Sequence, residues 1–212
     1  MPFNREDNTF FEMGSDGNPI PRVTENIGNI GEAVGDWKPN PKNYERVQGI
    51  VIDTRFLMYN YGKVNRVLVV APLSILGVWE EEFEKFADFP YSLTILKGTS
   101  AKKKEQLTKL PDEGLQIVVV NYESAWRLEK ELLAYNADLV IADEAHKLKE
   151  NRTSQSKGMH HIGDKAKYKL LLTGTVITNR EMDVFSQYRF LNPQIFGTSF
   201  YAFRNQYFDM GG

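Results

Sequence analysis

Leu139-Val-Ile-Ala-Asp-Glu-Ala-His146 joins an unbroken apolar run to two adjacent carboxylates. A short continuous apolar run of this kind is typical of a strand buried on both faces of a parallel sheet. Predicted strands and helices alternate around it from residue 66 to residue 190. Such alternation predicts an α/β fold, with a parallel sheet covered by helices on both faces. Asp143 and Glu144 are then expected at the carboxyl end of a buried strand, where open α/β sheets bind ligands.

The spacing of apolar residues also predicts where the other helices and strands of the fold lie. An amphipathic helix is expected within residues 44–59, with Gly62 as its terminator. Residues 1–43 are rich in Gly, Pro, Asn and Asp and lack an apolar period, so they are expected to be irregular or partly disordered. Residues 44–212 then form the folded domain. Strands are predicted at residues 66–70, 93–96, 117–120, 139–142 and 169–172, and helices at residues 74–86, 101–110, 123–135 and 181–190.

The carboxylate pair is a candidate for metal-assisted chemistry. One carboxylate at a strand end can hold a hydrated Mg²⁺ that bridges nucleotide phosphates, while its neighbour orients or deprotonates an attacking water. Taken alone, Asp143 and Glu144 also fit an ordinary strand followed by a solvated acidic turn. A second apolar run, Tyr168-Lys-Leu-Leu-Leu172, is followed by Thr173-Gly-Thr175, so it too is a strand ending in small polar residues.

Four segments resemble motifs of the Swi/Snf family within helicase superfamily two, and they occur in the family's order. Leu139–His146 resembles the Walker B segment, with its Asp-Glu-Ala-His signature, and residues 171–197 resemble motif III and the helix after it. The family usually has Pro where Val176 stands. Residues 67–86 resemble motif Ia, and Val118-Val-Val-Asn-Tyr-Glu123 resembles motif Ib. Residues 64–212 are therefore identified as a member of this family, which implies the N-terminal RecA-like lobe of a P-loop NTPase type.

The resemblance implies an ATP-dependent DNA translocase that hydrolyses ATP while moving on double-stranded DNA. Glu144 would be the catalytic base and Asp143 the Mg²⁺ ligand, so ATP and Mg²⁺ are the implied cofactors. His146 would couple the Walker B strand to motif III, although a solvent-facing histidine at a helix start also fits. Thr173, Gly174 and Thr175 would sense the nucleotide; the alternative is a turn with satisfied hydroxyls.

Contacts with DNA are expected in three places. Pro72, Leu73 and Ser74 open a helix whose N–H groups can face a phosphate. Tyr122 follows motif Ib, where the family touches the strand that it tracks, but a core tyrosine fits as well. A basic run between motifs II and III, which includes Lys149 and Arg152, could contact the DNA backbone or could be a solvated face. The run consists of Lys147, Lys149, Arg152, Lys157, Lys165, Lys167 and Lys169.

Two parts of the motor are absent from the sequence. No Gly-Lys-Thr or Gly-Lys-Ser occurs, so the loop that cradles the β- and γ-phosphates in the family is missing, and we expect weak or absent binding of ATP and Mg²⁺. Neither residues 10–17 nor Gly62-Lys63 replaces this loop, whereas Gln48 could match the family's adenine-reading glutamine. No second RecA-like lobe follows motif III, so an arginine finger would have to come from a lobe in cis or in trans. The chain is then either a fragment of a motor or a nucleotide-dead DNA-binding or interaction module.

Composition and histidine spacing exclude other classes of function. The chain of 212 residues has no cysteine, which excludes a disulfide framework and a thiolate metal site. It lacks a membrane-spanning run and a signal peptide pattern, so we expect a soluble protein in the cytoplasm or nucleus, without a membrane partner. A net charge of -2 means that nucleic acid must be bound through a local patch. Adjacent His160 and His161 diverge on a helix, and Asp143, Glu144 and His146 cannot all converge on one ion, so no metal hydrolase is expected.

Overall fold

The computed structural model describes residues 11–13, 19–21, 62–87, 89–173 and 181–208. They fall into two compact units, one made of Met1–Lys63 and Glu82–Ala87 and the other of Val64–Glu81 and Asp88–Gly212. In the first unit, β1 (Phe11–Met13) pairs antiparallel with β2 (Pro19–Pro21), within the segment predicted to be irregular. The helix predicted within residues 44–59, and Gln48, lie outside the described residues.

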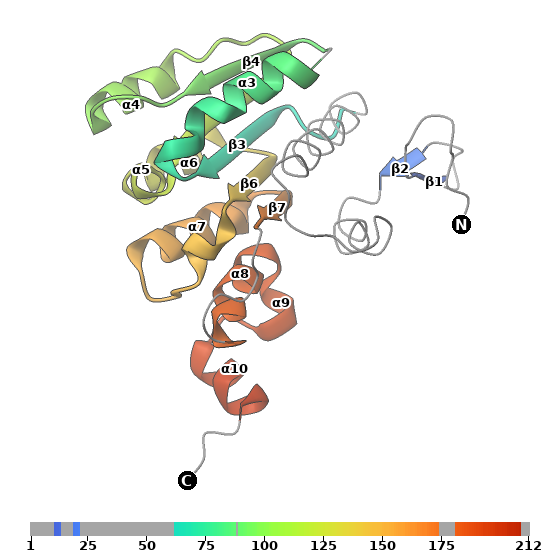
Figure 1. Ribbon diagram of the computed structural model, residues 1–212, viewed down its shortest axis with the longest axis vertical. Helices are drawn as coiled ribbons and strands as arrows, with labels where there is room; N and C mark the ends of the chain where they lie inside the picture. Colours follow the sequence, from blue (N-terminus) through green and yellow to red (C-terminus); the bar gives the residue numbers. More distant parts are fainter. Residues whose placement is uncertain (1–10, 14–18, 22–61, 88, 174–180, 209–212) are drawn as a thin grey trace. The chain divides into compact units, whose positions relative to one another are not determined.

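The second unit is built on five parallel strands in the order β4-β5-β3-β6-β7 (Figure 1). This arrangement confirms the predicted parallel sheet. The central position of β3 and β6 explains why their sequences are unbroken apolar runs, since helices cover both faces of the sheet there. The strands are β3 (Arg66–Ala71), β4 (Tyr91–Ile95), β5 (Leu115–Asn121), β6 (Leu139–Asp143) and β7 (Tyr168–Leu172).

The helices that connect these strands differ from the prediction in two places. The helix predicted at residues 123–135 is divided into two at Leu128, whose φ of -104° and ψ of 17° interrupt the helix. A helix was not predicted at Ser154–Lys165, where Gly158, Gly163 and polar residues weaken the helical pattern. The connecting helices are η1 (Leu73–Ile75), α3 (Leu76–Phe86), α4 (Ser100–Thr108), α5 (Tyr122–Arg127), α6 (Glu129–Tyr135), η2 (Ala145–Leu148) and α7 (Ser154–Lys165).

Close packing explains the two glycines of α7. A Cβ atom on Gly158 would lie 2.8 Å from Cβ of Trp126, and one on Gly163 would lie 2.8 Å from the ring of Phe190. Real Cβ atoms do not approach other atoms this closely, so only glycine lets α7 lie against α5 and α8 at this distance. The residues that weaken the helical pattern in the sequence are therefore the ones that the packing requires.

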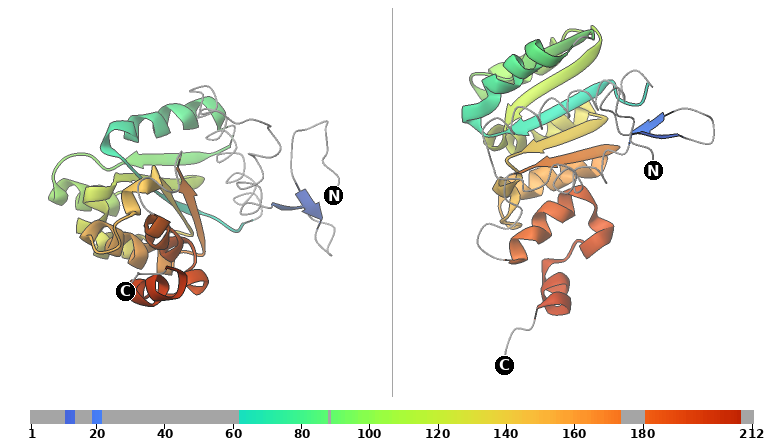
Figure 2. Two further views of the ribbon diagram at one scale, coloured as in Figure 1. Left: turned by 60° about the horizontal axis from the view of Figure 1, so that its bottom comes forward. Right: turned by 45° about the vertical axis from the view of Figure 1, so that its right-hand side comes forward.

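The direction of each connection assigns the helices to the two faces of the sheet. Because crossovers between parallel strands are right-handed, connections that run in opposite directions along the sheet lie on opposite faces. The chain leaves β3 towards β4 and leaves β6 towards β7, in opposite directions. The first part of α3, Leu76–Glu81, therefore lies across the sheet from α5, α6 and α7 (Figure 2). The carboxyl ends of β3 and β6 form the switch point at which such sheets bind ligands.

The hydrophobic core on the α5–α7 face alternates along the strands. Leu68, Val70, Val118, Val140 and Ala142 all face this side and pack against buried residues of the helices. The helical side is contributed by Ala125, Leu128, Leu132, Met159, Ile162 and Phe190. The odd-numbered residues of β6, Asp143 included, point to the other face, because side chains alternate along a strand.

The chain ends in three short helices joined by aromatic contacts. They are α8 (Val184–Leu191), preceded by η3 (Glu181–Asp183), then α9 (Pro193–Phe196) and α10 (Phe200–Tyr207). Phe203 is 3% exposed and its ring centroid lies 4.9 Å from that of Phe196 and 5.1 Å from that of Phe185. Among the described residues, no helix combines the length and the apolar character needed to cross a bilayer.

Candidate functional site

Asp143 is the last residue of β6 and is 1% exposed. Its carboxylate accepts a hydrogen bond at Oδ1 from the backbone N–H of Glu144 at 2.8 Å and another at Oδ2 from Nε1 of Trp79 at 3.0 Å. Both donors are neutral N–H groups, which suits an ionised carboxylate. Burial of such a group is costly without these bonds, and a buried carboxylate at a strand end is typical of a functional site.

Tyr122 fixes the main chain at the same residue. Its hydroxyl donates to the backbone carbonyl of Asp143 at 2.7 Å, and its side chain is 4% exposed. Burial raises the pKa of Tyr122 well above its ordinary value, and the carboxylates of Asp143 and Glu144 raise it further, so the hydroxyl stays a donor. This burial favours the core-tyrosine interpretation over a contact with nucleic acid.

Glu144 differs from its neighbour in both backbone and environment. Its φ of 50° and ψ of 53° are left-handed, a conformation that side chains other than glycine rarely adopt. Its Oε2 lies 3.1 Å from Nδ1 of His146, and the two side chains are 33% and 32% exposed. One carboxylate is thus buried and held, while the next is partly open to solvent. Two adjacent carboxylates in unlike environments can take different roles in one reaction.

Thr173 is brought to this edge by strand pairing. In the parallel register of β6 and β7, Asp143 is the partner of Leu172, so Thr173 follows on the strand next to Glu144. Thr173 is half-buried. Gly174 and Thr175, predicted to act with it, lie outside the described residues.

The candidates for DNA contact after β3 lie at the same edge of the sheet. In the pairing of β3 with β6, Val70 is the partner of Ala142, so the turn that follows β3 lies beside Asp143. Pro72 precedes η1, where Leu73 is 69% exposed and Ser74 is also exposed. These residues are therefore accessible, as a contact with phosphate requires.

The basic run predicted as one cluster is divided between the two edges of the sheet. Lys149 and Arg152 lie between η2 and α7, at the carboxyl edge. Because α7 carries the chain back across the sheet, Lys167 lies at the amino edge, with its Nζ 3.0 Å from Oδ1 of Asp138. Lys169 is half-buried in β7, and burial lowers its pKa. Only the first half of the run shares an edge with Asp143.

Arg152 also joins this edge to the C-terminal helices. Its Nη2 donates to the hydroxyl of Tyr201 at 2.6 Å, and its guanidinium carbon lies 5.6 Å from the centroid of that ring. The guanidinium of Arg204 lies 5.3 Å from the same ring. This contact spans a wide separation in sequence, and sequence analysis gave no sign of it.

The donor set suits Mg²⁺ only together with a nucleotide. In the described part of the chain, no three His, Cys, Asp or Glu side chains gather closely enough to hold a metal ion. Mg²⁺ is usually held by one or two carboxylates, with phosphates and waters completing its shell, so Asp143 alone meets the protein's share. His160 and His161 diverge: Nε2 of His160 lies 2.9 Å from the carbonyl of Ser186, and Nδ1 of His161 lies 2.8 Å from Oε1 of Glu129.

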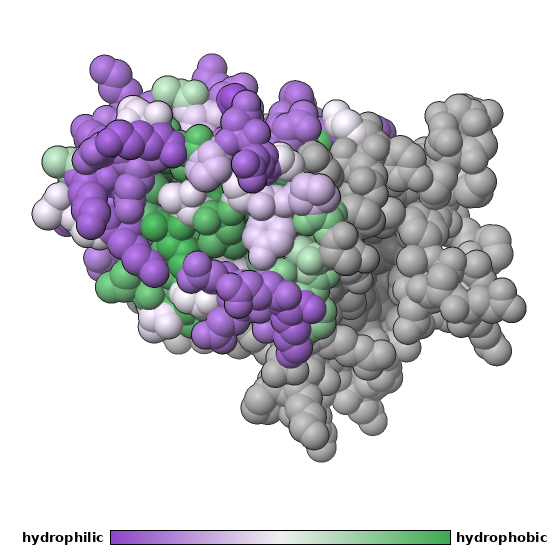
Figure 3. Space-filling model, turned by 90° about the horizontal axis from the view of Figure 1, so that it is seen from above, coloured by the Kyte–Doolittle hydropathy of each residue, from purple (hydrophilic) through white to green (hydrophobic). Residues whose placement is uncertain are grey.

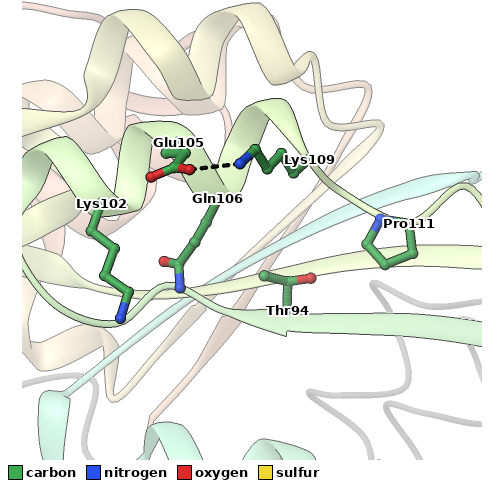
Figure 4. A pocket seen from close by; sticks show the side chains of 6 residues that line it. All are labelled: Thr94, Lys102, Glu105, Gln106, Lys109 and Pro111. Carbon is green, nitrogen blue, oxygen red and sulfur yellow. Dashed lines mark hydrogen bonds and ion pairs between the residues drawn. The ribbon is translucent and has the colours of Figure 1, made fainter.

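A shallow pocket of about 370 Å³ lies elsewhere, between β4 and α4 (Figure 4). Several of its polar groups have partners: Lys109 pairs with Glu105 at 2.6 Å, and Oε1 of Gln106 accepts the backbone N–H of Lys97. Figure 3 shows the face that carries β4 and α4, where hydrophilic side chains surround a smaller apolar area. This pocket holds no feature of a reaction centre. Its lining residues are Thr94, Lys102, Glu105, Gln106, Lys109 and Pro111.

The contact at the candidate site that the sequence did not predict is that of Trp79. This residue lies in the segment that resembles motif Ia, within the helix predicted at residues 74–86. Its partner, Asp143, is 64 residues away in the chain. The available signal was an indole N–H, which needs a partner when it is buried.

The fold and this strand end define a RecA-like lobe, and comparison with known proteins agrees. The SWI2/SNF2 ATPase core of Sulfolobus solfataricus in complex with dsDNA superposes with a TM-score of 0.61 at 29% identity, over 73% of this chain and 31% of that one. The ATPase core domain alone gives a TM-score of 0.56 at 28% identity, over 72% of this chain and 30% of that one.

Sequence relatives point to the same family. Switch 2 of Arabidopsis thaliana is 32% identical over 133 residues, which cover 62% of this chain and 15% of that protein. A DNA repair and recombination protein RAD54-like of Drosophila ananassae is 32% identical over 144 residues, covering 64% and 18%. Residues 44–209 match the SNF2-related domain, so the chain belongs to this family and corresponds to an N-terminal lobe of the Swi/Snf type, as predicted. It spans 15% and 18% of the length of these two relatives.

Proposed function

We propose that this chain is the N-terminal ATPase lobe of an ATP-dependent DNA translocase. The observation that carries the proposal is the carboxyl edge of the sheet, where Asp143 is buried between two N–H donors and Glu144, beside it, is partly open to solvent. Membership of the SNF2-related family supports it. So does the likeness to a SWI2/SNF2 core solved with dsDNA.

In this proposal the two carboxylates divide the work. The Asp-Glu-Ala-His segment acts as the family's Walker B motif, and Asp143 holds Mg²⁺ together with the nucleotide phosphates. When bound, Mg²⁺ neutralises the charge that develops on the transferred phosphoryl group. Glu144 orients the attacking water and accepts its proton, and His146, 3.1 Å away, steadies the Glu144 carboxylate. Thr173, with Gly174 and Thr175, couples this strand end to motif III.

The same edge supplies the contacts with double-stranded DNA. Pro72, Leu73 and Ser74 offer an exposed turn, and Lys149 and Arg152, between η2 and α7, offer positive charge. Contacts of this kind recognise phosphates, so they fix the register of the protein without reading base sequence. A second RecA-like lobe, in cis or in trans, would complete the ATP site with an arginine finger. The protein would then act in a compartment that holds DNA.

One sequence feature supports a different function. The chain contains no Gly-Lys-Thr or Gly-Lys-Ser, and each charge-assisted hydrogen bond lost with that loop removes about 1.5–3 kcal/mol of phosphate binding. The second candidate is therefore a nucleotide-dead module that keeps the sheet and the basic edge, and binds DNA or a protein partner.

Titration with a fluorescent ATP analogue and Mg²⁺ separates the two candidates. An ATPase lobe without the phosphate loop should bind no more tightly than roughly millimolar, about 4 kcal/mol of binding free energy, and Asp143→Asn should abolish that binding. Glu150→Gln is the matched control, because Glu150 is an exposed carboxylate outside the carboxylate pair. Binding that is absent, or unchanged in Asp143→Asn, would favour the nucleotide-dead module.

A further inference from the structure

Two buried side chains from separate segments hold Asp143. Trp79, on α3, is 1% exposed and donates its indole N–H to Oδ2 of the carboxylate at 3.0 Å. Tyr122, the first residue of α5, donates its hydroxyl proton to the backbone carbonyl at 2.7 Å. One bond therefore acts on the carboxylate and the other on the main chain. Trp79 sets the orientation of the carboxylate, whereas Tyr122 sets the position of the residue.

The indole is linked by a short helix to the exposed turn after β3. Pro72 precedes η1, and α3 follows η1 without a break at Leu76. By the rise of an α-helix, Trp79 lies roughly 8 Å along the axis from Ser74. A helix this short moves as a unit, because its backbone hydrogen bonds link each turn to the next. A displacement of the exposed turn would therefore be carried along the helix to the indole and to the carboxylate that it contacts.

We infer that Trp79 is a positioning residue for Asp143, and that it couples contact of DNA with Pro72–Ser74 to the orientation of the metal-holding carboxylate. The inference rests on the proposed function, because that function assigns the metal to Asp143 and DNA to the turn. The chemistry favours this role for an indole: it is a donor only, and its large ring is fully packed, so its N–H has one fixed direction. Loss of the donor removes the indole's hold on Oδ2 and so weakens the fixed orientation of the carboxylate, while the backbone N–H of Glu144 still donates to Oδ1.

The experiment measures the Mn²⁺ dependence of the binding of a fluorescent ATP analogue to the full chain, with and without double-stranded DNA, because Asp143 holds the ion only together with nucleotide phosphates. Trp79→Phe keeps an aromatic ring but removes the N–H. It should weaken Mn²⁺ binding on the order of 10-fold, which is the effect of one hydrogen bond to a charged group. It should also remove the effect of DNA on Mn²⁺ affinity. Trp126→Phe, which replaces the same residue type on α5, should leave both quantities as in the wild type.

Asp143→Asn separates failure of this inference from failure of the proposed function. If Asp143→Asn binds Mn²⁺ as tightly as the wild type, the metal is held elsewhere and the proposed function loses its metal site. If Asp143→Asn loses binding while Trp79→Phe retains wild-type affinity and the wild-type effect of DNA, only the positioning role is overturned.

A measurement on the unaltered chain covers the case in which Trp79→Phe fails to fold. By reciprocity of linked binding, a coupled site must bind Mn²⁺ more tightly when DNA is present, and DNA more tightly when Mn²⁺ is present. We expect both affinities to rise by the same factor, about 5-fold or more. Equal Mn²⁺ affinity with and without DNA would overturn the coupling.

Discussion

β6 has an aspartate at each end, and the protein holds the two in different ways. Asp138, just before the strand, accepts backbone N–H bonds from Asn65 and Arg66 at 2.9 and 3.1 Å and pairs with Lys167 at 3.0 Å. Asp143, at the other end, accepts N–H bonds from Trp79 and Glu144 and lies beside a partly exposed carboxylate. Asp138 links the start of β3 to the start of β6 through hydrogen bonds from the backbone, and its charge is compensated by that of Lys167. The contacts at the amino edge thus favour stability, and the carboxyl edge carries the proposed chemistry.

The largest expected effect tests the carboxyl edge. Glu144→Gln should preserve nucleotide binding but lower ATP hydrolysis by about 10²–10⁴-fold, because the amide cannot accept a proton from water. The measurement is phosphate release with ATP, Mg²⁺ and double-stranded DNA, in the presence of a second lobe where the single lobe is too slow. Glu150→Gln is the control and should hydrolyse ATP at the wild-type rate. Equal rates for wild type and Glu144→Gln would remove Glu144 from the mechanism.

A change at the amino edge should act on stability alone. Asp138→Asn should lower the free energy of unfolding by about 1–3 kcal/mol, because it weakens two backbone contacts and an ion pair, and it should leave hydrolysis unchanged. Partial burial raises the pKa of Asp138, but bonds from Asn65, Lys167 and Arg66 outweigh it, so the pKa is lowered. The stabilisation is therefore present above the unfolded pKa of about 3.9 and is lost as the pH falls through the folded value.

Urea unfolding of wild type and Asp138→Asn at several pH values tests this pH dependence. The free energies of unfolding of the two proteins should become equal as the pH falls through the folded pKa of Asp138. A fall in hydrolysis equal to that of Glu144→Gln would contradict the division between the edges.

His160 gives a pH-dependent effect from α7, which joins the two edges. Burial lowers the pKa of His160 to about 4, although the backbone carbonyl of Ser186 acts in the other direction. The unfolded chain therefore takes up a proton first as the pH falls below about 6.5, and the folded state should lose about 2–3 kcal/mol before the pH reaches the folded pKa. Urea unfolding across this range should show the loss in the wild type and not in His160→Gln. If the free energy of unfolding falls equally with pH in the wild type and in His160→Gln, another group causes the acid sensitivity.

The smallest expected effect is on the salt dependence of DNA binding. It distinguishes Lys149 at the carboxyl edge from Lys167 at the amino edge. Lys149→Ala should lower the salt dependence of DNA binding by about one unit of slope in a plot of log affinity against log salt, with no preference for base sequence. Lys167→Ala should leave that slope unchanged and cost at most about 1 kcal/mol of stability, because its ion pair is exposed. Fluorescence anisotropy with two unrelated labelled duplexes measures both. If the two variants lower the slope equally, the basic run acts as one surface.

Much of the fold was predictable because buried parallel strands carry their own signal. The runs at β3, β5 and β6 are unbroken and apolar, and each strand lies within a residue or two of its predicted position. Helix α7 could not be predicted in this way, since Gly158 and Gly163 are set by the approach of Trp126 and Phe190, which are distant in sequence. Packing between elements, rather than helix propensity, determines these two positions.

The candidate site was predictable only where its residues adjoin one another in sequence. Asp143 and Glu144 follow a buried strand, so their place at the carboxyl edge could be inferred. The hydrogen bond from Trp79 joins two residues that are 64 positions apart, so no local sequence pattern predicts it. The basic run looked continuous in sequence, but α7 reverses the chain and sends Lys167 to the opposite edge from Lys149. Sequence proximity fails wherever a helix carries the chain across the sheet.

The left-handed backbone of Glu144 has a consequence for how this edge tolerates change. A non-glycine residue in that conformation costs roughly 1–2 kcal/mol, so a glycine at this position would give a more stable fold. The same replacement would remove the carboxylate. Selection for thermal stability alone would therefore tend to replace the carboxylate, whereas the proposed role in catalysis would keep it at a thermodynamic disadvantage. The backbone of Glu144 is thus a place where the proposed chemistry and the stability of the fold make opposite demands on one residue.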